Sequence, residues 1–424
     1  MPADELVMFL HTEMSAISRG RAVPTSELDQ RLQAGVGWVP ANAALTPFGN
    51  VADPNPWGSV GDVRLLPDPQ TEVRLGDLPG RSPLHFYQCD VVNLDGTGWP
   101  ACPRVYLKRV LEEFASETGL QVVAAFEHEF YLRSAGAAAP LGAPFSLEAL
   151  RQADWFGPRL VGSLREAGLE PETFLPEYGP GQFEVTCLPA PALQAADRAV
   201  AVRVAVREVA RSSGWRATFT PVVDPAIPAN GVHIHLSFRD RSGRPAAYDA
   251  AGSQGMSAAA ARFAGGVLEH LPAVCAFAAP SMISYLRLTP HHWSASLARV
   301  ANDREAAVRL PGIKVGPDSA EPGAQFNLEF RFPDAAACPH LALAILVRAG
   351  WQGIRDGTER ATGGGGRIPD SLEAAMGALA ADQGLQSWLP AELLATYTAL
   401  KSAEIAHLRD RTPIEACGEY LDIY

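Results

Sequence analysis

The chain has 424 residues, of which 47% are hydrophobic and 19% are charged, and its net charge is −12. This length and composition support a large core and two or three domains, and they exclude a disordered protein. The acidic balance argues against nucleic acid or an anionic membrane as a partner, because both require a basic surface.

The six cysteines are widely scattered, and none of them forms a Cys-x-x-Cys pair. We therefore expect neither a zinc ribbon nor thioredoxin chemistry, and a reduced, cytoplasmic location fits the pattern. The first residues lack the basic start and long apolar region of a signal peptide. The longest apolar stretch, 271–286, is interrupted by Pro272 and Pro280, so we expect no membrane span.

The first 98 residues predict a small β-rich domain. Proline and glycine crowd through 36–61, and alternating apolar segments lie on both sides of that region. The predicted strands cover 6–10, 16–23, 63–71 and 84–92.

After Pro103 the pattern changes to helices mixed with strands, and we expect a second domain over 99–424. Because no regular strand–helix–strand alternation is present, the class is α+β. The predicted helices cover 105–118, 147–167, 195–211, 257–271, 340–354 and most of 371–408.

Four strand-like segments alternate apolar residues with residues that bind metals or anions; they are 125–132, 181–186, 231–238 and 326–332. Successive side chains of a strand point to opposite faces, so each segment has one apolar and one polar face. Such a polar face needs divalent cations and an anionic substrate to neutralise it. The polar faces carry Glu127 and Glu129, Gln182 and Glu184, His233, His235 and Ser237, and Asn327, Glu329 and Arg331.

The glutamates have alternative explanations. Glu127 and Glu129 repel each other on one strand face unless a cation lies between them, but they could equally form a solvent-facing acidic edge. The segment from Glu177 to Glu184 joins two glutamates through a Gly/Pro turn. Carboxylates on a tight backbone suit Mg²⁺ or Mn²⁺, and we favour a metal site there over an ordinary turn.

Histidines and arginines supply the complementary groups. His233 and His235 share a face with Ser237, so one imidazole could bind a metal and the other could contact a phosphate or a base. Arg287, Arg304, Arg309 and Arg331 could clamp carboxylates or phosphates, although a single arginine usually ends in a surface ion pair. The sequence contains no phosphate-binding loop of the Gly-x-x-x-x-Gly-Lys type.

Together these motifs resemble the glutamine synthetase family, in particular its type I members and the branch that joins glutamate to amines. The resemblance extends along nearly the whole chain. Its signatures are Glu127-His-Glu129, Glu177-x-Gly-Pro-Gly-Gln-Phe-Glu184, Asn230-Gly-Val-His-Ile-His-x-Ser237, Asp303-Arg-Glu-Ala-Ala-Val-Arg309 and Asn327-Leu-Glu-Phe-Arg-Phe-Pro-Asp334.

The resemblance implies an N-terminal β-grasp domain and a catalytic domain with an antiparallel sheet flanked by helices. It also implies a homo-oligomer, a hexameric ring or a dodecamer, with active sites between neighbouring subunits. Two or more Mg²⁺ or Mn²⁺ ions and ATP would be bound in each site. The substrates would be L-glutamate, ATP and an amine.

The family's roles transfer to matching positions of this sequence. Arg304, Glu177 and Glu329 are the expected catalytic residues. The expected metal ligands are Glu129, Glu177 and Glu184 for one ion and Glu127, His233 and Glu329 for the other. His235, Ser237 and Arg309 match nucleotide contacts, and Gly231, Arg287 and Arg331 match the glutamate site.

The sequence departs from the family in the acceptor pocket. Trp293 stands where the flap of typical members carries a glutamate, and Phe145 lies near the usual pocket tyrosine. We expect Glu13 in place of the usual aspartate of the ammonium site. Asn327 replaces an arginine that contacts the nucleotide. Aromatic residues would suit an organic amine better than ammonium.

The expected function is therefore ATP-dependent formation of a γ-glutamyl amide through a γ-glutamyl phosphate. The acceptor would be an organic amine, such as a polyamine, ethanolamine, another alkylamine or an arylamine. The alternatives are an ordinary glutamine synthetase that uses ammonia and a catalytically weak relative with a binding role.

Overall fold

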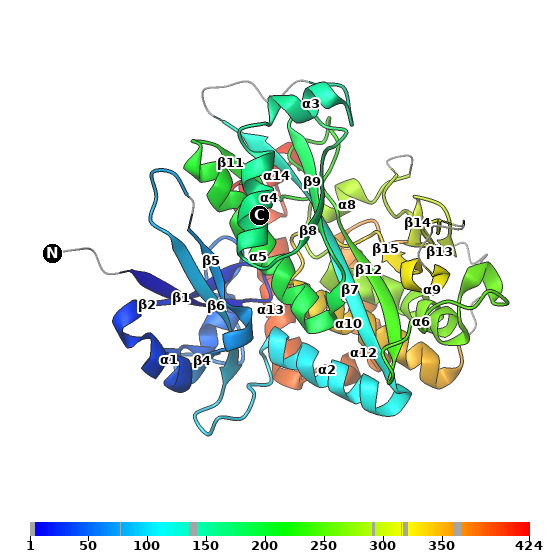
Figure 1. The fold of residues 1–424 in the computed structure, drawn as a ribbon. Helices are drawn as coiled ribbons and strands as arrows, with labels where there is room; N and C mark the ends of the chain where they lie inside the picture. Colours follow the sequence, from blue (N-terminus) through cyan, green and yellow to red (C-terminus); the bar gives the residue numbers. More distant parts are fainter. Residues whose placement is uncertain are drawn as a thin grey trace.

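A computed structural model describes residues 5–76, 78–134, 142–290, 293–314, 316, 321–358 and 366–424. Two sheets organise this part of the chain (Figure 1). The first belongs to the N-terminal segment, drawn in blue, and the second crosses the centre of the larger part.

The N-terminal domain is the expected β-grasp sheet, with strand order β2-β1-β6-β4-β3 and β5 paired to β6. β1 runs parallel to β6, and the other strands of the sheet pair antiparallel. The elements are β1 (Leu6–Thr12), β2 (Ser18–Pro24), α1 (Leu28–Ala34), β3 (Val36–Trp38), β4 (Val63–Pro67), β5 (Val73–Leu75) and β6 (Leu84–Val92). The strand predicted over 63–71 ends at Pro67, because a single turn of 3₁₀ helix, Pro69–Thr71, follows it.

The catalytic sheet has the order β16-β13-β14-β15-β12-β7-β9-β8, and β10 and β11 also pair with β7. All of these pairs are antiparallel except β13 with β14, which departs from the purely antiparallel expectation. The strands are β7 (Leu120–Arg133), β8 (Pro171–Pro176), β9 (Gln182–Cys187), β10 (Ala190–Pro191), β11 (Arg216–Thr218), β12 (Val232–Asp240), β13 (Leu297–Ala301), β14 (Ala306–Arg309), β15 (Leu328–Phe330) and β16 (Gly366–Arg367).

Helices pack against this sheet (Figure 1). Phe238 of β12 packs against Phe114 and Phe263 of the covering helices. The helices are α2 (Pro103–Thr118), α3 (Leu147–Gln152), α4 (Gly157–Glu166), α5 (Ala192–Ser212), α6 (Ala258–Glu269), α7 (Leu271–Ala278), α8 (Ser284–Arg287), α9 (Pro322–Gln325), α10 (Pro339–Asp356), α11 (Leu372–Ala381), α12 (Gln383–Trp388), α13 (Ala391–Leu408) and α14 (Pro413–Tyr420).

The single helix predicted over 147–167 is wrong. The chain forms α3 and α4 with a break between them, and Pro158 lies in the first turn of α4. A proline is tolerated there but not in a helix interior, where it would remove a hydrogen bond and clash with the preceding turn. The apolar spacing on both sides of the break is helical, which is why the periodicity alone did not reveal it.

A buried arginine joins the two domains. The Arg104 guanidinium of α2 contacts Asp197 of α5 at 2.9 Å and also Asp90 at 2.6 Å and Asp68 at 2.8 Å in the N-terminal domain. His340 of α10 contacts the same Asp197 at 2.8 Å. This network fixes the small sheet against the helices that carry the catalytic sheet.

All six cysteines are buried and unpaired. Among the described residues, no helix is both long and apolar enough to span a bilayer.

Candidate active site

Strand register gathers the polar residues of the four segments. β12 lies between β7 and β15, with His233 opposite Glu127 and His235 opposite Glu329. On the other side of β7, Glu129 stands opposite Glu184 of β9. The polar faces that the alternation predicts therefore form one continuous surface on the open side of the sheet.

Two groups on this surface have the composition of metal sites. Glu127, His233 and Glu329 offer one set of ligand atoms, and Glu129, Glu184 and His233 offer a second; within each set the atoms lie within 4.8 Å of one another. The His233 ring links the sets, since Nδ1 is 3.1 Å from Glu127 and Nε2 is 3.9 Å from Glu129. Carboxylate oxygens with one imidazole suit Mg²⁺ or Mn²⁺, so the residues fit the expected cations.

The electrostatics of the cluster also favour bound cations. Burial together with the surrounding glutamates raises the pKa of Glu184 to about 10. Burial and Glu129 raise the pKa of Glu177 to about 7. Carboxylates forced together in this way hold protons at neutral pH unless a cation replaces them.

Contacts with histidines lower the pKa of Glu127. Burial alone would raise its pKa, but the contacts with His233 and His235 outweigh burial and hold the pKa well below its usual range. Burial would lower the pKa of His235, but its 2.9 Å contact with Glu127 raises that pKa to about 9.

Glu177 reaches the cluster from the turn between β8 and β9. Its backbone N–H donates to the Gln182 carbonyl at 2.9 Å, which closes the turn. Gly179 permits this path, because a Cβ there would lie 1.9 Å from the Tyr131 hydroxyl oxygen. The Gly/Pro pattern between the two glutamates thus has a steric cause.

Gly231 lies beside both the acids and Arg287. Its N–H donates to Glu129 at 2.9 Å, and a Cβ at this position would lie 3.0 Å from the His233 ring. Arg287 is buried and donates to three backbone carbonyls, those of Arg331, Phe332 and Pro333. Its guanidinium is therefore held rigidly at the cavity wall, with few donors left for a substrate.

Three further arginines line the cavity. Arg331 donates to Glu329, to the Arg304 carbonyl at 2.9 Å and to the Trp293 carbonyl at 2.9 Å. Arg309 donates to Glu329 at 2.6 Å. Arg304 is exposed and lines the same cavity, close enough to Glu177 to counteract the rise of its pKa.

His235 and Ser237 continue along β12 beyond the cavity lining. His235 Nδ1 is 2.9 Å from the Asn327 side-chain oxygen, and the Ser237 hydroxyl donates to the Phe326 carbonyl at 2.9 Å. Their expected contacts with a nucleotide stay predictions. Asn327, which replaces the family's arginine, serves here as the partner of His235.

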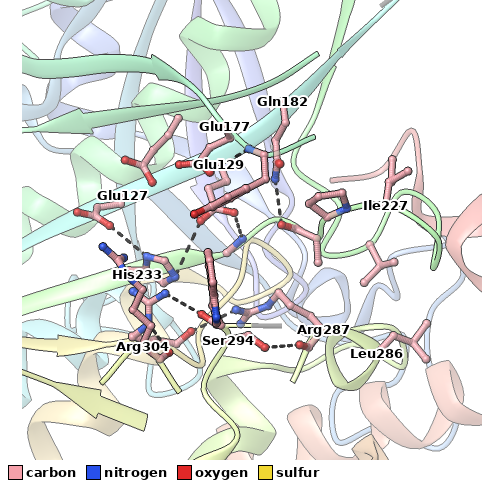
Figure 2. A pocket seen from close by; sticks show the side chains of 18 of the residues that line it. Glu127, Glu129, Glu177, Gln182, Ile227, His233, Leu286, Arg287, Ser294 and Arg304 are labelled. Carbon is pink, nitrogen blue, oxygen red and sulfur yellow. Dashed lines mark hydrogen bonds and ion pairs between the residues drawn. The ribbon is translucent and has the colours of Figure 1, made fainter. Parts of the chain in front are cut away.

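A cavity of about 790 Å³ contains most of the expected site residues. The volume lies in the usual range of small-molecule sites. Figure 2 shows that the cavity has two different ends, with Glu127 and His233 at one and Ile227 and Leu286 at the other. The expected residues that line it are Glu127, Glu129, Phe145, Glu177, Glu184, Gly231, His233, Arg287, Trp293, Arg304, Arg309, Glu329 and Arg331.

Three aromatic side chains form a cluster on this cavity. The Tyr178 ring makes edge contacts with Phe145 at 4.8 Å and with Trp293 at 5.5 Å between ring centroids. Each of the three is about half exposed. Sequence reasoning missed Tyr178, although its place between Glu177 and Gly179 could have revealed it. His291 and His292 of the flap segment lie outside the described residues.

Glu13 does not join this aromatic cluster. It lies at the end of β1, almost fully buried, and one carboxylate oxygen is 2.7 Å from Arg19. Burial raises its pKa to about 8 despite the arginine. Within this chain, Phe145, Tyr178 and Trp293 line the cavity and Glu13 does not, so the expected amine pocket of Glu13, Phe145 and Trp293 stays a prediction.

Comparisons with known proteins assign both domains to one family. Residues 100–417 match the glutamine synthetase catalytic domain, and residues 2–99 match the glutamine synthetase N-terminal domain. A gamma-glutamylpolyamine synthetase of Streptomyces coelicolor is 33% identical over 384 residues, which cover 88% of this chain and 80% of the relative. A glutamine synthetase of Methanocaldococcus jannaschii is 29% identical over 385 residues, which cover 85% of this chain and 83% of that relative.

Among solved structures, the crystal structure of a novel glutamine synthase homolog is 44% identical, covers 100% of this chain and 99% of its own, and superposes with a TM-score of 0.95. Members of the matched family use ATP and divalent metals. The chain therefore belongs to the glutamine synthetase family and is a carbon–nitrogen ligase.

Proposed function

We propose that this ligase joins the γ-carboxylate of L-glutamate to an organic amine at the expense of ATP. The observation that carries the proposal is the contrast within one cavity. Acids and arginines suited to phosphoryl transfer line one part of the cavity, and a cluster of three aromatic rings, which offers no carboxylate to an ammonium ion, lines another part. The relative named as a gamma-glutamylpolyamine synthetase supports an amine acceptor.

The chemistry has two steps. The γ-carboxylate of glutamate attacks the γ-phosphate of ATP, which gives γ-glutamyl phosphate and ADP. The amine nitrogen then attacks the acyl carbon, phosphate leaves with the bridging oxygen, and the amine gives up a proton. The product is a γ-glutamyl amide.

The residues divide these tasks. Glu129, Glu177 and Glu184 would hold one divalent cation, and Glu127, His233 and Glu329 a second. These cations supply charge neutralisation at the phosphoryl group. Arg304, the exposed arginine of the wall, would face the transferred phosphoryl group and stabilise its developing charge.

Glutamate would lie between Gly231 and the two clamp arginines. Arg331 is held by two backbone carbonyls and by Glu329, so its guanidinium is already oriented before a substrate binds. A closed cavity also protects the acyl phosphate from water. The expected ring-shaped assembly stays a prediction, and so does any contribution of a neighbouring subunit.

The second candidate is an ordinary glutamine synthetase. The name of the Methanocaldococcus relative favours it, since ammonia is then the acceptor. The replacement of the flap glutamate by Trp293 argues against it, because a tryptophan cannot balance an ammonium ion as a carboxylate does.

Phosphate release separates the two candidates. The purified protein would be assayed with ATP, Mg²⁺ and glutamate across ammonium, ethanolamine, putrescine, spermine, isopropylamine and aniline. The proposal is supported if phosphate release with one organic amine far exceeds release with ammonium, and if the γ-glutamyl amide of that amine is identified by mass spectrometry. If ammonium is the best acceptor, the protein is a glutamine synthetase. If no acceptor gives phosphate release and the protein still binds nucleotide, a binding role is left.

A further inference from the structure

We propose that the acceptor is a primary monoamine with an apolar tail, not a polyamine. This inference rests on the proposed function and concerns the end of the cavity away from the acids. Its three supports are the position of every described carboxylate in the lining, the apolar wall away from the acids, and two strained aromatic residues that line the same cavity.

The described carboxylates of the cavity lining are all in one cluster. Five glutamates line the cavity among the described residues, namely Glu127, Glu129, Glu177, Glu184 and Glu329. All five belong to the acid cluster on the sheet, where histidines, arginines and the expected cations balance them. No described carboxylate of the lining is left to pair with a second ammonium group of the acceptor.

The opposite end of the cavity is apolar. Val222, Ile227 and Leu286 line it together with small and cyclic residues of the loop before Gly231. Figure 2 shows Ile227 and Leu286 grouped away from Glu127 and His233. Asp224 lies on the same loop, but it is not part of the lining, and its Oδ1 accepts the Ala226 N–H at 2.8 Å. A second ammonium group placed here would lose water without gaining an anion.

The aromatic cluster lines the same cavity. The Trp293 carbonyl accepts a hydrogen bond from Arg331, so the tryptophan is tied directly to the expected glutamate clamp. An amine held by the rings would have its nitrogen near that clamp, and its tail could extend toward the apolar wall. Half-exposed rings provide apolar area for the tail to cover.

Backbone strain marks the same two positions. Phe145 has a φ of 58° and Trp293 a φ of 51°, in the left-handed region that bulky residues rarely adopt. Both contact Tyr178 from either side. Strain that places two rings on one cavity is expected where the rings have a function, because glycine would satisfy the backbone at lower cost.

An isosteric pair of amines tests the inference. n-Pentylamine and putrescine have the same number of heavy atoms, and they differ in a terminal methyl against a terminal ammonium group. We expect kcat/KM for n-pentylamine to exceed that for putrescine by about tenfold or more. Equal values or a preference for putrescine would overturn the inference while leaving the amine-ligase function intact. If ammonium were the only acceptor, or if no amine gave activity, the proposed function and this inference would both be overturned.

A charge placed on the apolar wall should weaken the preference for the apolar amine. Ala226 is exposed at that end, and Ala226→Glu would supply the missing anion, so the ratio of putrescine to n-pentylamine should rise by about tenfold. Ala251→Glu is the matched control, because Ala251 is also exposed and its N–H donates to Asp249 two residues before it, outside the cavity. An unchanged ratio in the folded Ala226→Glu variant, or the same change in both variants, would overturn the inference.

Discussion

The acid end of the cavity and the part that carries the aromatic cluster, here called the aromatic end, are built from different kinds of structure. The acid end stands on β7, β9, β12 and β15, where register fixes which side chains meet. The aromatic end stands on loops and turns that hold Phe145, Tyr178 and Trp293. We infer that the acid end carries the chemistry common to the family, and that the aromatic end determines which amine is used.

The largest expected effect is at the acid end. Glu184→Gln should lower kcat by on the order of 10³, because it removes a carboxylate from the expected metal site. The same variant should raise the melting temperature of the metal-free protein, since a buried carboxylate among other carboxylates is unfavourable. Glu172→Gln, on the exposed side of β8, is the control. Full activity in Glu184→Gln would remove this residue from the site.

The arginine clamp should show the next largest effect. Arg331→Lys keeps the charge but cannot make the three simultaneous contacts of the guanidinium, so kcat/KM for glutamate should fall by about 10². The KM for ATP should change little. Arg239→Lys, at the exposed end of β12, controls for the substitution itself. A selective loss of ATP affinity would argue against the glutamate assignment.

The aromatic end should change selectivity more than rate. Trp293→Glu combined with Phe145→Tyr should lower kcat/KM for an organic amine by about tenfold and raise activity with ammonium. Steady-state assays with the organic amine and with ammonium measure this change in selectivity. Leu147→Glu, a change at an exposed apolar residue outside the cavity, should leave the ratio of the two activities unaltered. No gain with ammonium would count against the pocket assignment.

The smallest predicted effect is on stability. The folded protein raises the pKa of Glu177 to about 7, that of Glu184 to about 10 and that of His235 to about 9. The folded state then binds more protons than the unfolded state between about pH 5 and pH 9, so the free energy of unfolding falls as the pH rises.

We expect a progressive loss of stability across that range in EDTA. Urea unfolding at pH 5.5, 7 and 8.5 measures it. Saturating Mn²⁺ should flatten the dependence by replacing the protons. A metal-free protein that becomes more stable toward high pH would contradict the electrostatic description of the acid end.

Sequence patterns predicted the acid end well because alternation and register are local properties of strands. Glu127, His233 and Glu329 are far apart in the chain, yet each is identified by its own two-residue period, and the structure brings them together. The α+β class is also confirmed, as is the β-grasp domain that the family resemblance implies.

The aromatic end was harder to predict because loops have no period. Tyr178 was missed, and the part expected for Glu13 in the amine pocket stays a prediction, because Glu13 does not line the cavity of its own chain. The positions of Phe145 and Trp293 depend on positive φ values that no residue type other than glycine would indicate. The break between α3 and α4 was also missed, although Pro158 could have marked it.

The most direct test of the account follows the oxygen atoms of glutamate. L-Glutamate labelled with ¹⁸O in both γ-carboxylate oxygens would be incubated with the protein, ATP, Mg²⁺ and n-pentylamine, and the products analysed by mass spectrometry. The account predicts one ¹⁸O in the released phosphate and one in the γ-glutamyl amide. Phosphate without label, or an absence of the amide, would contradict it.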